Sequence, residues 1–171
     1  MNLYDHQKEI LSLIKTHKKL FIESDRQSGI STVLQIYAMI SARYHHKKIM
    51  VYTHNMRFGA DWMDKMRQYT EDTHIDQTKN YVKFPDGGVI LNKGFNDIFT
   101  GGMCGYRLDE IIFDECYNIH DRMFEVLHHI VPAMNTDYKI IYSLTGHEQI
   151  EIEGFFKYNK NDYKPKLLKR K

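Results

Sequence analysis

The sequence predicts an α/β fold in which a mostly parallel central sheet is covered by helices on both of its faces. Short, fully apolar runs alternate with longer segments whose apolar residues have helical spacing. Strands that lack polar positions are typical of parallel sheets, because such sheets are buried on both sides. A turn sequence between two short apolar stretches also predicts a small β-hairpin insertion.

Each predicted element has its own signal in the sequence. Helical spacing of apolar residues predicts helices over residues 3–16, 33–40, 58–69 and 124–134. Apolar runs predict strands over residues 20–22, 48–52, 111–113 and 140–144. The hairpin is expected between Tyr81 and Leu91, around the turn PDGG at 85–88. In such sheets ligands bind at the carboxyl ends of the strands.

Length and composition limit the class of protein. The 171 residues, of which 42% are hydrophobic, are enough for one well-buried domain and too few for two. No stretch approaches the ~18 consecutive apolar residues of a membrane-spanning helix, which argues against a membrane partner. Cys104 and Cys116 have no close-spaced partner, which predicts free thiols in a reducing compartment. We therefore expect a protein that is not secreted.

Positive charge gathers at the end of the chain. The net charge is +2, yet residues 155–171 contain seven of the 24 basic residues and one of the 22 acidic residues. Four aromatic residues are interleaved with these lysines, a pattern that suits stacking on bases and pairing with phosphates. A solvated tail or a linker explains the same composition. We predict a domain over residues 1–150 and a basic, aromatic tail over residues 151–171.

The segment after the first predicted strand has the character of a phosphate-binding loop. Backbone N–H groups at a helix start bind phosphate, and a glycine lets the anion approach. The full motif is a glycine or small residue, four further residues, then Gly-Lys-Ser/Thr. Ser24, Gly29 and Ser31 occupy three of these positions, and Ile30 stands where lysine is usual. Taken alone, this incomplete match also suits a tight strand-to-helix turn with a serine cap.

Two adjacent carboxylates end a later predicted strand. Asp114 and Glu115 follow the apolar run at 111–113. In phosphoryl-transfer sites an aspartate at this place belongs to the Mg²⁺ shell, and a neighbouring carboxylate takes the proton from the attacking water. An acidic pair at a turn or helix start is the alternative interpretation. The order of the two motifs, and the elements on which they fall, favour a nucleotide site.

Four segments together resemble large terminase subunits, the ATPases that package DNA in tailed phages. The sequence SDRQSGIST at 24–32 is similar to their phosphate loop, which has Arg-Gln, one residue, then Gly-Lys-Ser/Thr. The sequence YDHQ at 4–7 resembles their adenine-binding element, LDEIIFDE at 108–115 their acidic strand motif, and SLTG at 143–146 their coupling motif. The resemblance covers residues 3–150 and implies the RecA-like fold of P-loop NTPases.

The resemblance also implies a role for individual residues. Glu115 would be the general base, Asp114 and Ser31 would hold Mg²⁺, and Thr145 would couple loss of the γ-phosphate to DNA movement. Arg26 would support catalysis by holding phosphate oxygens in place of the missing lysine. The expected ATP-binding set is His6 and Gln7 at the adenine, with Ser24, Arg26, Gln27, Ser28, Gly29, Ile30, Ser31, Thr32 and Thr145 around the phosphates.

The implied activity is hydrolysis of ATP with Mg²⁺, coupled to translocation of double-stranded DNA into a capsid. The implied partners are double-stranded DNA, the portal, the small terminase subunit and a separately encoded nuclease, in a homo-oligomeric ring. The ring would act in the host cytoplasm, on the viral procapsid. Two departures from the family are present. Ile30 removes a cation from the phosphate site, and residues 151–171 are too few for the nuclease domain of a complete large terminase.

Two other functions fit the same motifs. One RecA-like domain of a superfamily 2 helicase or translocase also combines an upstream glutamine, a phosphate loop and an Asp-Glu strand. Such an enzyme needs a second RecA-like domain to complete its site. A degenerate nucleotide-binding regulator, with weak or no turnover, is the second alternative, and Ile30 is the residue that motivates it.

Overall fold

The structure is a computed structural model that describes residues 3–67, 76–77, 81–85, 87–99, 107–117, 119–146 and 150–159. The helices in these ranges are α1 (Asp5–Thr16), α2 (Ile30–His45), α3 (Met56–Arg67) and α4 (Met123–Ile130). The strands are β1 (Lys19–Ser24), β2 (Lys48–Thr53), β3 (Asp76–Gln77), β4 (Tyr81–Lys83), β5 (Val89–Gly94), β6 (Leu108–Asp114), β7 (Met134–Thr145) and β8 (Phe156–Asn159). Three short 3-10 helices complete the set: η1 (Phe95–Ile98), η2 (His120–Arg122) and η3 (Val131–Ala133).

The strands form one sheet in the order β3-β4-β5-β2-β6-β7-β1-β8. Every neighbouring pair from β5 to β8 is parallel, whereas β3 and β4 are antiparallel additions at one edge. The predicted α/β fold with a mostly parallel sheet is therefore confirmed. The central strands are in register at their carboxyl ends, where Ser24 lies opposite Thr145 and Asp114 lies opposite Ser143.

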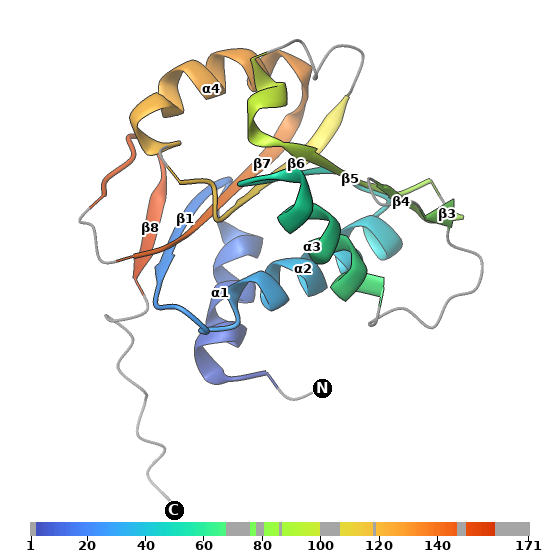
Figure 1. Ribbon diagram of the computed structural model, residues 1–171, viewed down its shortest axis with the longest axis horizontal. Helices are drawn as coiled ribbons and strands as arrows, with labels where there is room; N and C mark the ends of the chain where they lie inside the picture. The colour runs from blue at the N-terminus through green and yellow to red at the C-terminus, as the bar shows by residue number, and fades with distance from the viewer. Residues whose placement is uncertain are drawn as a thin grey trace, which may run out of the picture.

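Helices cover both faces of the sheet, with α1, α2 and α3 on one side and α4 on the other (Figure 1). Because side chains alternate along a strand, β1 divides its apolar residues between two cores. Leu20 and Ile22 pack in the core beneath α1, α2 and α3, and Phe21 packs in the core beneath α4. All three side chains are fully buried, which explains why the strand has no alternation of apolar and polar residues.

The fourth predicted helix is shorter than expected. The sequence predicts a helix over 124–134, but α4 ends at Ile130 and a 3-10 turn follows, with Pro132 in its first positions. Proline lacks the N–H group that a helix interior requires, so the apolar spacing past Ile130 could not continue the helix. The last residue of the predicted helix, Met134, begins the next strand instead, and β7 runs from Met134 to Thr145. In the described part of the chain, no helix has the length and apolar character to cross a membrane.

The sheet includes a strand that lies within the predicted tail. Phe156–Asn159 form β8, which pairs in parallel with β1. Tyr158 is buried and donates a hydrogen bond to Glu9 (3.3 Å), while Lys157 makes an ion pair of 2.9 Å with the buried Glu23. The side chains of Lys157 and Tyr158 therefore stabilise the folded domain. Residues 160–171 of the predicted tail lie outside the described residues, and the boundary at residue 150 stays a prediction.

The hairpin predicted around residues 85–88 is present. Strands β4 and β5 pair antiparallel, and the N–H of Phe84 donates to the carbonyl of Gly88 over 2.8 Å. The turn packs closely on the far end of α2. A Cβ atom at Gly88 would lie 1.9 Å from the carbonyl oxygen of Ala42, so glycine is required by a backbone-to-backbone contact.

This contact predicts that Gly88→Ala destabilises the protein. The methyl group would force α2 and the hairpin apart, and overpacking of this kind costs about 2 kcal/mol. Denaturant unfolding followed by circular dichroism measures the change. Gly146→Ala is the control, because a Cβ there meets nothing within 4 Å and the backbone needs no positive φ. Equal stability of the two variants would contradict the close packing of the hairpin on α2.

Candidate functional site

Residues predicted for the site from three distant segments lie together at one edge of the sheet. Strands β6, β7 and β1 are neighbours and parallel, so their carboxyl ends meet. The amide N–H of Gly146, just after β7, donates to the carbonyl of Ser24 at the end of β1 (3.2 Å). The amide of Glu115, just after β6, donates to the carbonyl of Ser143 (3.1 Å). The backbone itself thus ties the phosphate loop, the acidic pair and the SLTG segment together.

The predicted phosphate loop connects β1 to α2. The hydroxyl of Ser28 donates to the hydroxyl of Ser24 over 3.1 Å, which closes the loop on itself. Gly29 caps the helix in the left-handed conformation, with φ of +74°, and Gln27 also has a positive φ of 61°. This is a helix start with a left-handed glycine and N–H groups without intrahelical partners, a geometry that suits an anion.

The two residues predicted for adenine contact the loop. His6 Nε2 lies 3.0 Å from the carbonyl oxygen of Ser28, and Gln7 Nε2 donates to the carbonyl of Gly29 over 3.3 Å. The other end of the Gln7 amide accepts a bond from the N–H of Tyr4 (3.0 Å). A Cβ at Gly29 would lie 2.4 Å from Gln7 Nε2, so Gly29 is needed for this approach as well. Helix α1 therefore holds the phosphate loop in place.

The residues at the start of α2 divide between the core and the site. Ile30 is 5% exposed and belongs to the apolar core beneath α1, α2 and α3. Ser31 belongs to the site, because the interaction of its hydroxyl with Asp114 lowers the pKa of that carboxyl. Thr32, the next residue, is half-buried, and Arg26 lies exposed on the loop. The position of the missing lysine is thus an apolar core position.

Asp114 is the buried centre of the site. Its Oδ1 accepts a hydrogen bond of 2.5 Å from the hydroxyl of Ser143, and its Oδ2 accepts one of 2.9 Å from the indole N–H of Trp62. Burial is the main cause that raises the pKa of Asp114, and the charge of Glu115 acts in the same direction. The hydrogen bonds from Ser143 and Trp62 and the interaction with Ser31 lower it, and the net pKa is about 6. Donors from α3 and β7 hold this desolvated carboxylate, and Ser31 of α2 also interacts with it.

Glu115 lies beside Asp114 but faces the SLTG segment. Its backbone has a φ of +56°, which is uncommon for a residue with a side chain and is typical of functional positions. Both carboxylate oxygens accept hydrogen bonds from Thr145, one from the hydroxyl and one from the backbone N–H (3.3 Å). Tyr117 also interacts with Glu115: partial burial and this interaction raise the pKa of Tyr117, the charge of Arg26 lowers it, and the net pKa is about 12.

Three residues of this network were not predicted for the site. Trp62 lies on the apolar stripe of α3 and was expected to be core, which it is, but its indole N–H also reaches Asp114. Ser143 belongs to the SLTG segment, yet no sequence pattern indicated a partner for its hydroxyl. Tyr117 has no motif at all. A polar atom on an otherwise apolar helix stripe was the available signal for Trp62.

The residues present fit a magnesium ion. Mg²⁺ prefers oxygen ligands and is usually held by one or two carboxylates together with substrate phosphates and water. Ser31 and Asp114 supply a hydroxyl and a carboxylate that already meet each other at the mouth of the loop. No group of three or more His, Cys, Asp or Glu side chains suited to a metal occurs among the described residues. The fit is therefore to an ion that shares its ligands with a bound phosphate.

Comparison with solved structures identifies the fold. No protein-family model and no curated protein matches the sequence. Among solved structures, the large terminase of a thermophilic bacteriophage in complex with ADP superposes with a TM-score of 0.64 at 11% identity. The viral genome packaging motor of bacteriophage Phi-29 gives 0.60 at 13%, and the SWI2/SNF2 ATPase core of Sulfolobus solfataricus in complex with double-stranded DNA gives 0.59 at 15%.

These similarities cover most of this chain but a minor part of each neighbour. The aligned region is 84% of this chain and 39% of the thermophilic phage terminase chain, and 84% against 46% for the Phi-29 motor. For the SWI2/SNF2 core it is 86% against 32%. The identities are low, so the comparisons show the fold. That fold is the RecA-like ATPase fold predicted from the sequence.

The buried position of Asp114 predicts an unusual pH dependence of stability. The folded state holds the Asp114 proton more tightly than the unfolded chain does, because the pKa is about 6 in the fold and 3.8 without it. The contribution of the protonated Asp114 carboxyl to the free energy of unfolding is therefore present at low pH and is lost as pH rises from about 4 to about 6. Asp114→Asn removes the loss, so between pH 4 and pH 7 the variant should gain about 2 kcal/mol in free energy of unfolding relative to wild type.

Urea unfolding of both proteins across this pH range measures the effect. Asp137→Asn supplies a control of opposite sign, because the hydrogen bond and charge of Lys18 hold the pKa of Asp137 below its ordinary value. The stabilisation that ionised Asp137 provides is present at neutral pH and is lost as pH falls. The free energy of unfolding of Asp137→Asn should therefore decrease relative to that of wild type as pH rises. Parallel pH profiles for Asp114→Asn and wild type would contradict a raised Asp114 pKa.

Proposed function

We propose that this chain is the ATPase domain of a motor that packages viral DNA, and that it uses ATP hydrolysis to move double-stranded DNA into a capsid. One observation supports the proposal most strongly. The interaction of Ser31 with Asp114 and the two Glu115–Thr145 hydrogen bonds join the phosphate loop, the acidic pair and the SLTG segment in a fold shared with packaging motors. A tight turn or a surface acidic pair would not need this arrangement.

Phosphate binding is assigned to the start of α2. Its first N–H groups and the positive end of the helix dipole face the place where the β- and γ-phosphates would lie. Arg26 is exposed on the same loop, and its guanidinium offers a planar pair of donors to phosphate oxygens. His6 and Gln7 keep the loop in shape through its carbonyl groups, and the stacked rings of Tyr4 and His6 (5.9 Å) are available for the adenine.

Glu115 is proposed to orient the attacking water and to accept its proton. A carboxylate has about four acceptor positions, so the two bonds from Thr145 leave capacity for a water molecule. The same bonds give the coupling a physical route. Protonation of Glu115 would weaken its hold on Thr145, and the end of β7 would then be free to shift against β1.

Ser31 and Asp114 are proposed to hold Mg²⁺, which neutralises charge on the phosphate oxygens when it is bound with ATP. Trp62 and Ser143 keep the Asp114 carboxylate in one orientation by bonding one oxygen each. We also propose that the domain works in a homo-oligomeric ring with the portal, the small terminase subunit and a separately encoded nuclease, on the procapsid in the host cytoplasm. Phosphoryl transfer is mostly a matter of positioning and electrostatics, which this rigid network would provide.

Two alternative functions are each supported by one observation. The similarity to the SWI2/SNF2 core fits one RecA-like domain of a superfamily 2 translocase, whose site a second domain would complete. The buried Ile30 fits a nucleotide-binding regulator that does not turn over, because no lysine is available at this position of the loop. Variants at Glu115 and Ile30 separate the ATPase from the regulator.

Glu115→Gln should retain ATP binding and lose hydrolysis. The amide keeps the size of the side chain and cannot accept a proton, and general-base catalysis contributes roughly a hundredfold or more. Steady-state phosphate release with double-stranded DNA present measures turnover, and equilibrium dialysis with labelled ATP measures binding. The control is Glu125→Gln, the same change on α4 where Glu125 pairs with Arg122. Hydrolysis unchanged by Glu115→Gln would remove Glu115 as the base.

Ile30→Lys should tighten ATP binding by about tenfold or more, because a charge-assisted hydrogen bond contributes about 1.5–3 kcal/mol. The aliphatic stem of a lysine can keep part of the core packing while its ammonium extends to the phosphates. Ile30→Met is the matched control, with a long unbranched chain and no charge. If wild type is silent and Ile30→Lys hydrolyses ATP, the regulator is the correct function. If wild type already hydrolyses ATP with DNA, the motor is supported.

A further inference from the structure

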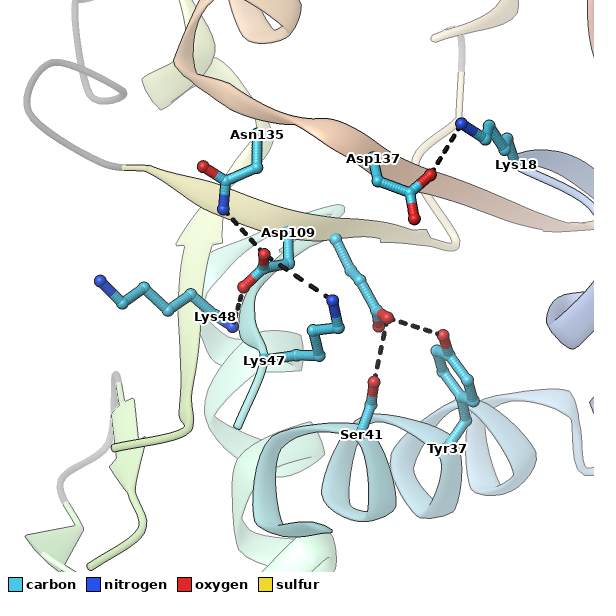
Figure 2. Close-up of polar contacts among 9 residues, drawn as sticks. Lys18, Tyr37, Ser41, Lys47, Lys48, Asp109, Asn135 and Asp137 are labelled. Atoms are coloured by element: carbon cyan, nitrogen blue, oxygen red, sulfur yellow. Dashed lines mark hydrogen bonds and ion pairs between the residues drawn. The ribbon is translucent and has the colours of Figure 1, made fainter. Parts of the chain in front are cut away.

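A pocket lies at the opposite end of the sheet from the phosphate loop. It has a volume of about 350 Å³, in the range of small-molecule sites. Its walls are the middle of α1, the second half of α2 and the first residues of β6, with Leu11, Ile40 and Glu110 among the lining residues. Figure 2 shows the polar side of this region, where Tyr37 and Ser41 of α2 both point toward the sheet.

Glu110 is the acidic residue among those that line the pocket. It is 5% exposed, and its Oε1 accepts two hydrogen bonds, one from the hydroxyl of Tyr37 (2.9 Å) and one from that of Ser41 (3.0 Å). Its Oε2 is buried and has no hydrogen-bond partner among the described residues. Buried polar atoms without a partner are rare in folded proteins and call for an explanation. A ligand with an N–H donor would supply the missing partner.

Cations surround this carboxylate. Burial raises the pKa of Glu110, and the charges of Lys139 and Lys47 oppose that rise; Lys15 lines the pocket from α1. Lys139 is held in place by a hydrogen bond to the carbonyl of Ile14 and lies 5.9 Å from the Tyr37 ring centre. Lys47 pairs loosely with Asp109, at 3.9 Å. Asp109 beside Lys47 and Asp137 near Lys139 offset part of this positive charge. Among the lining residues themselves, three lysines outnumber the one carboxylate, which favours an anion over a cation as ligand.

We propose that this pocket binds a small organic anion that carries N–H donors on a flat or apolar body, the class to which nucleoside monophosphates belong. The N–H group would donate to Glu110 Oε2, the anionic group would lie among Lys15, Lys47 and Lys139, and the body would pack against Leu11 and Ile40. The proposal is independent of the function assigned to the phosphate loop, because it uses none of the same residues.

The test is a titration with AMP, followed by NMR of the isoleucine and leucine methyl groups in the full chain. Shifts at the methyls of Leu11 and Ile40 are expected, since both residues line the pocket. Ile30, at the phosphate loop, reports binding at the other site. Adenosine, which lacks the anion, and inorganic phosphate, which lacks the donor, should each bind at least about tenfold more weakly. Shifts confined to Ile30, or no shifts at millimolar AMP, would overturn the proposal.

Two variants test the contacts separately. Glu110→Gln keeps the side-chain shape but replaces an acceptor by a donor, and should weaken AMP binding in the pocket by about tenfold. Lys15→Gln removes an exposed rim charge with little risk to the fold, and should weaken it severalfold. Lys18→Gln is the matched control, because Lys18 pairs with Asp137 outside the pocket (Figure 2). Equal AMP affinity for Lys15→Gln and Lys18→Gln, with Glu110→Gln also unchanged, would overturn the proposal.

Discussion

Asp114 is a carboxylate with no exposure to solvent, and the architecture of the site follows from the need to satisfy it. A desolvated carboxylate is costly unless hydrogen-bond donors surround it. Here the donors come from the middle of α3 and the end of β7, and Ser31 at the start of α2 also interacts with the carboxylate. Each donor fixes the position of its own element against β6. The chemistry of one side chain therefore sets the geometry of the whole carboxyl edge.

The phosphate loop is held in place by helix α1. Gln7 is bonded at both ends of its amide, to Tyr4 and to the loop carbonyl of Gly29. The space that this amide occupies is the space that a Cβ of residue 29 would fill. Glycine is therefore required at this position for two reasons: the backbone is left-handed, and Gln7 of α1 lies where a Cβ would be. The loop is preformed by packing, so an anion would not have to order it.

Sequence patterns predicted what depends on local spacing. Apolar runs and helical stripes indicated the parallel sheet, and the loop and acidic pair fell at strand ends because strand ends are where such runs stop. The missed contacts join distant segments. The indole of Trp62 looked like core, since a stripe position does not show where an N–H points. Tyr158 and Lys157 looked like a solvated tail, because their partners Glu9 and Glu23 lie at the other end of the chain.

Helix α2 is fastened to strand β6 at both of its ends. Ser31 interacts with Asp114 at one end, and the Ser41 hydroxyl donates a hydrogen bond to Glu110 at the other. The helix rises about 15 Å between the two serines, at about 1.5 Å per residue, and the strand about 13 Å between the two acids, at about 3.3 Å per residue. The spans match because both acids lie on the same face of β6. A shift of α2 along β6 would disturb both carboxylates together, which joins the phosphate loop mechanically to the distant pocket.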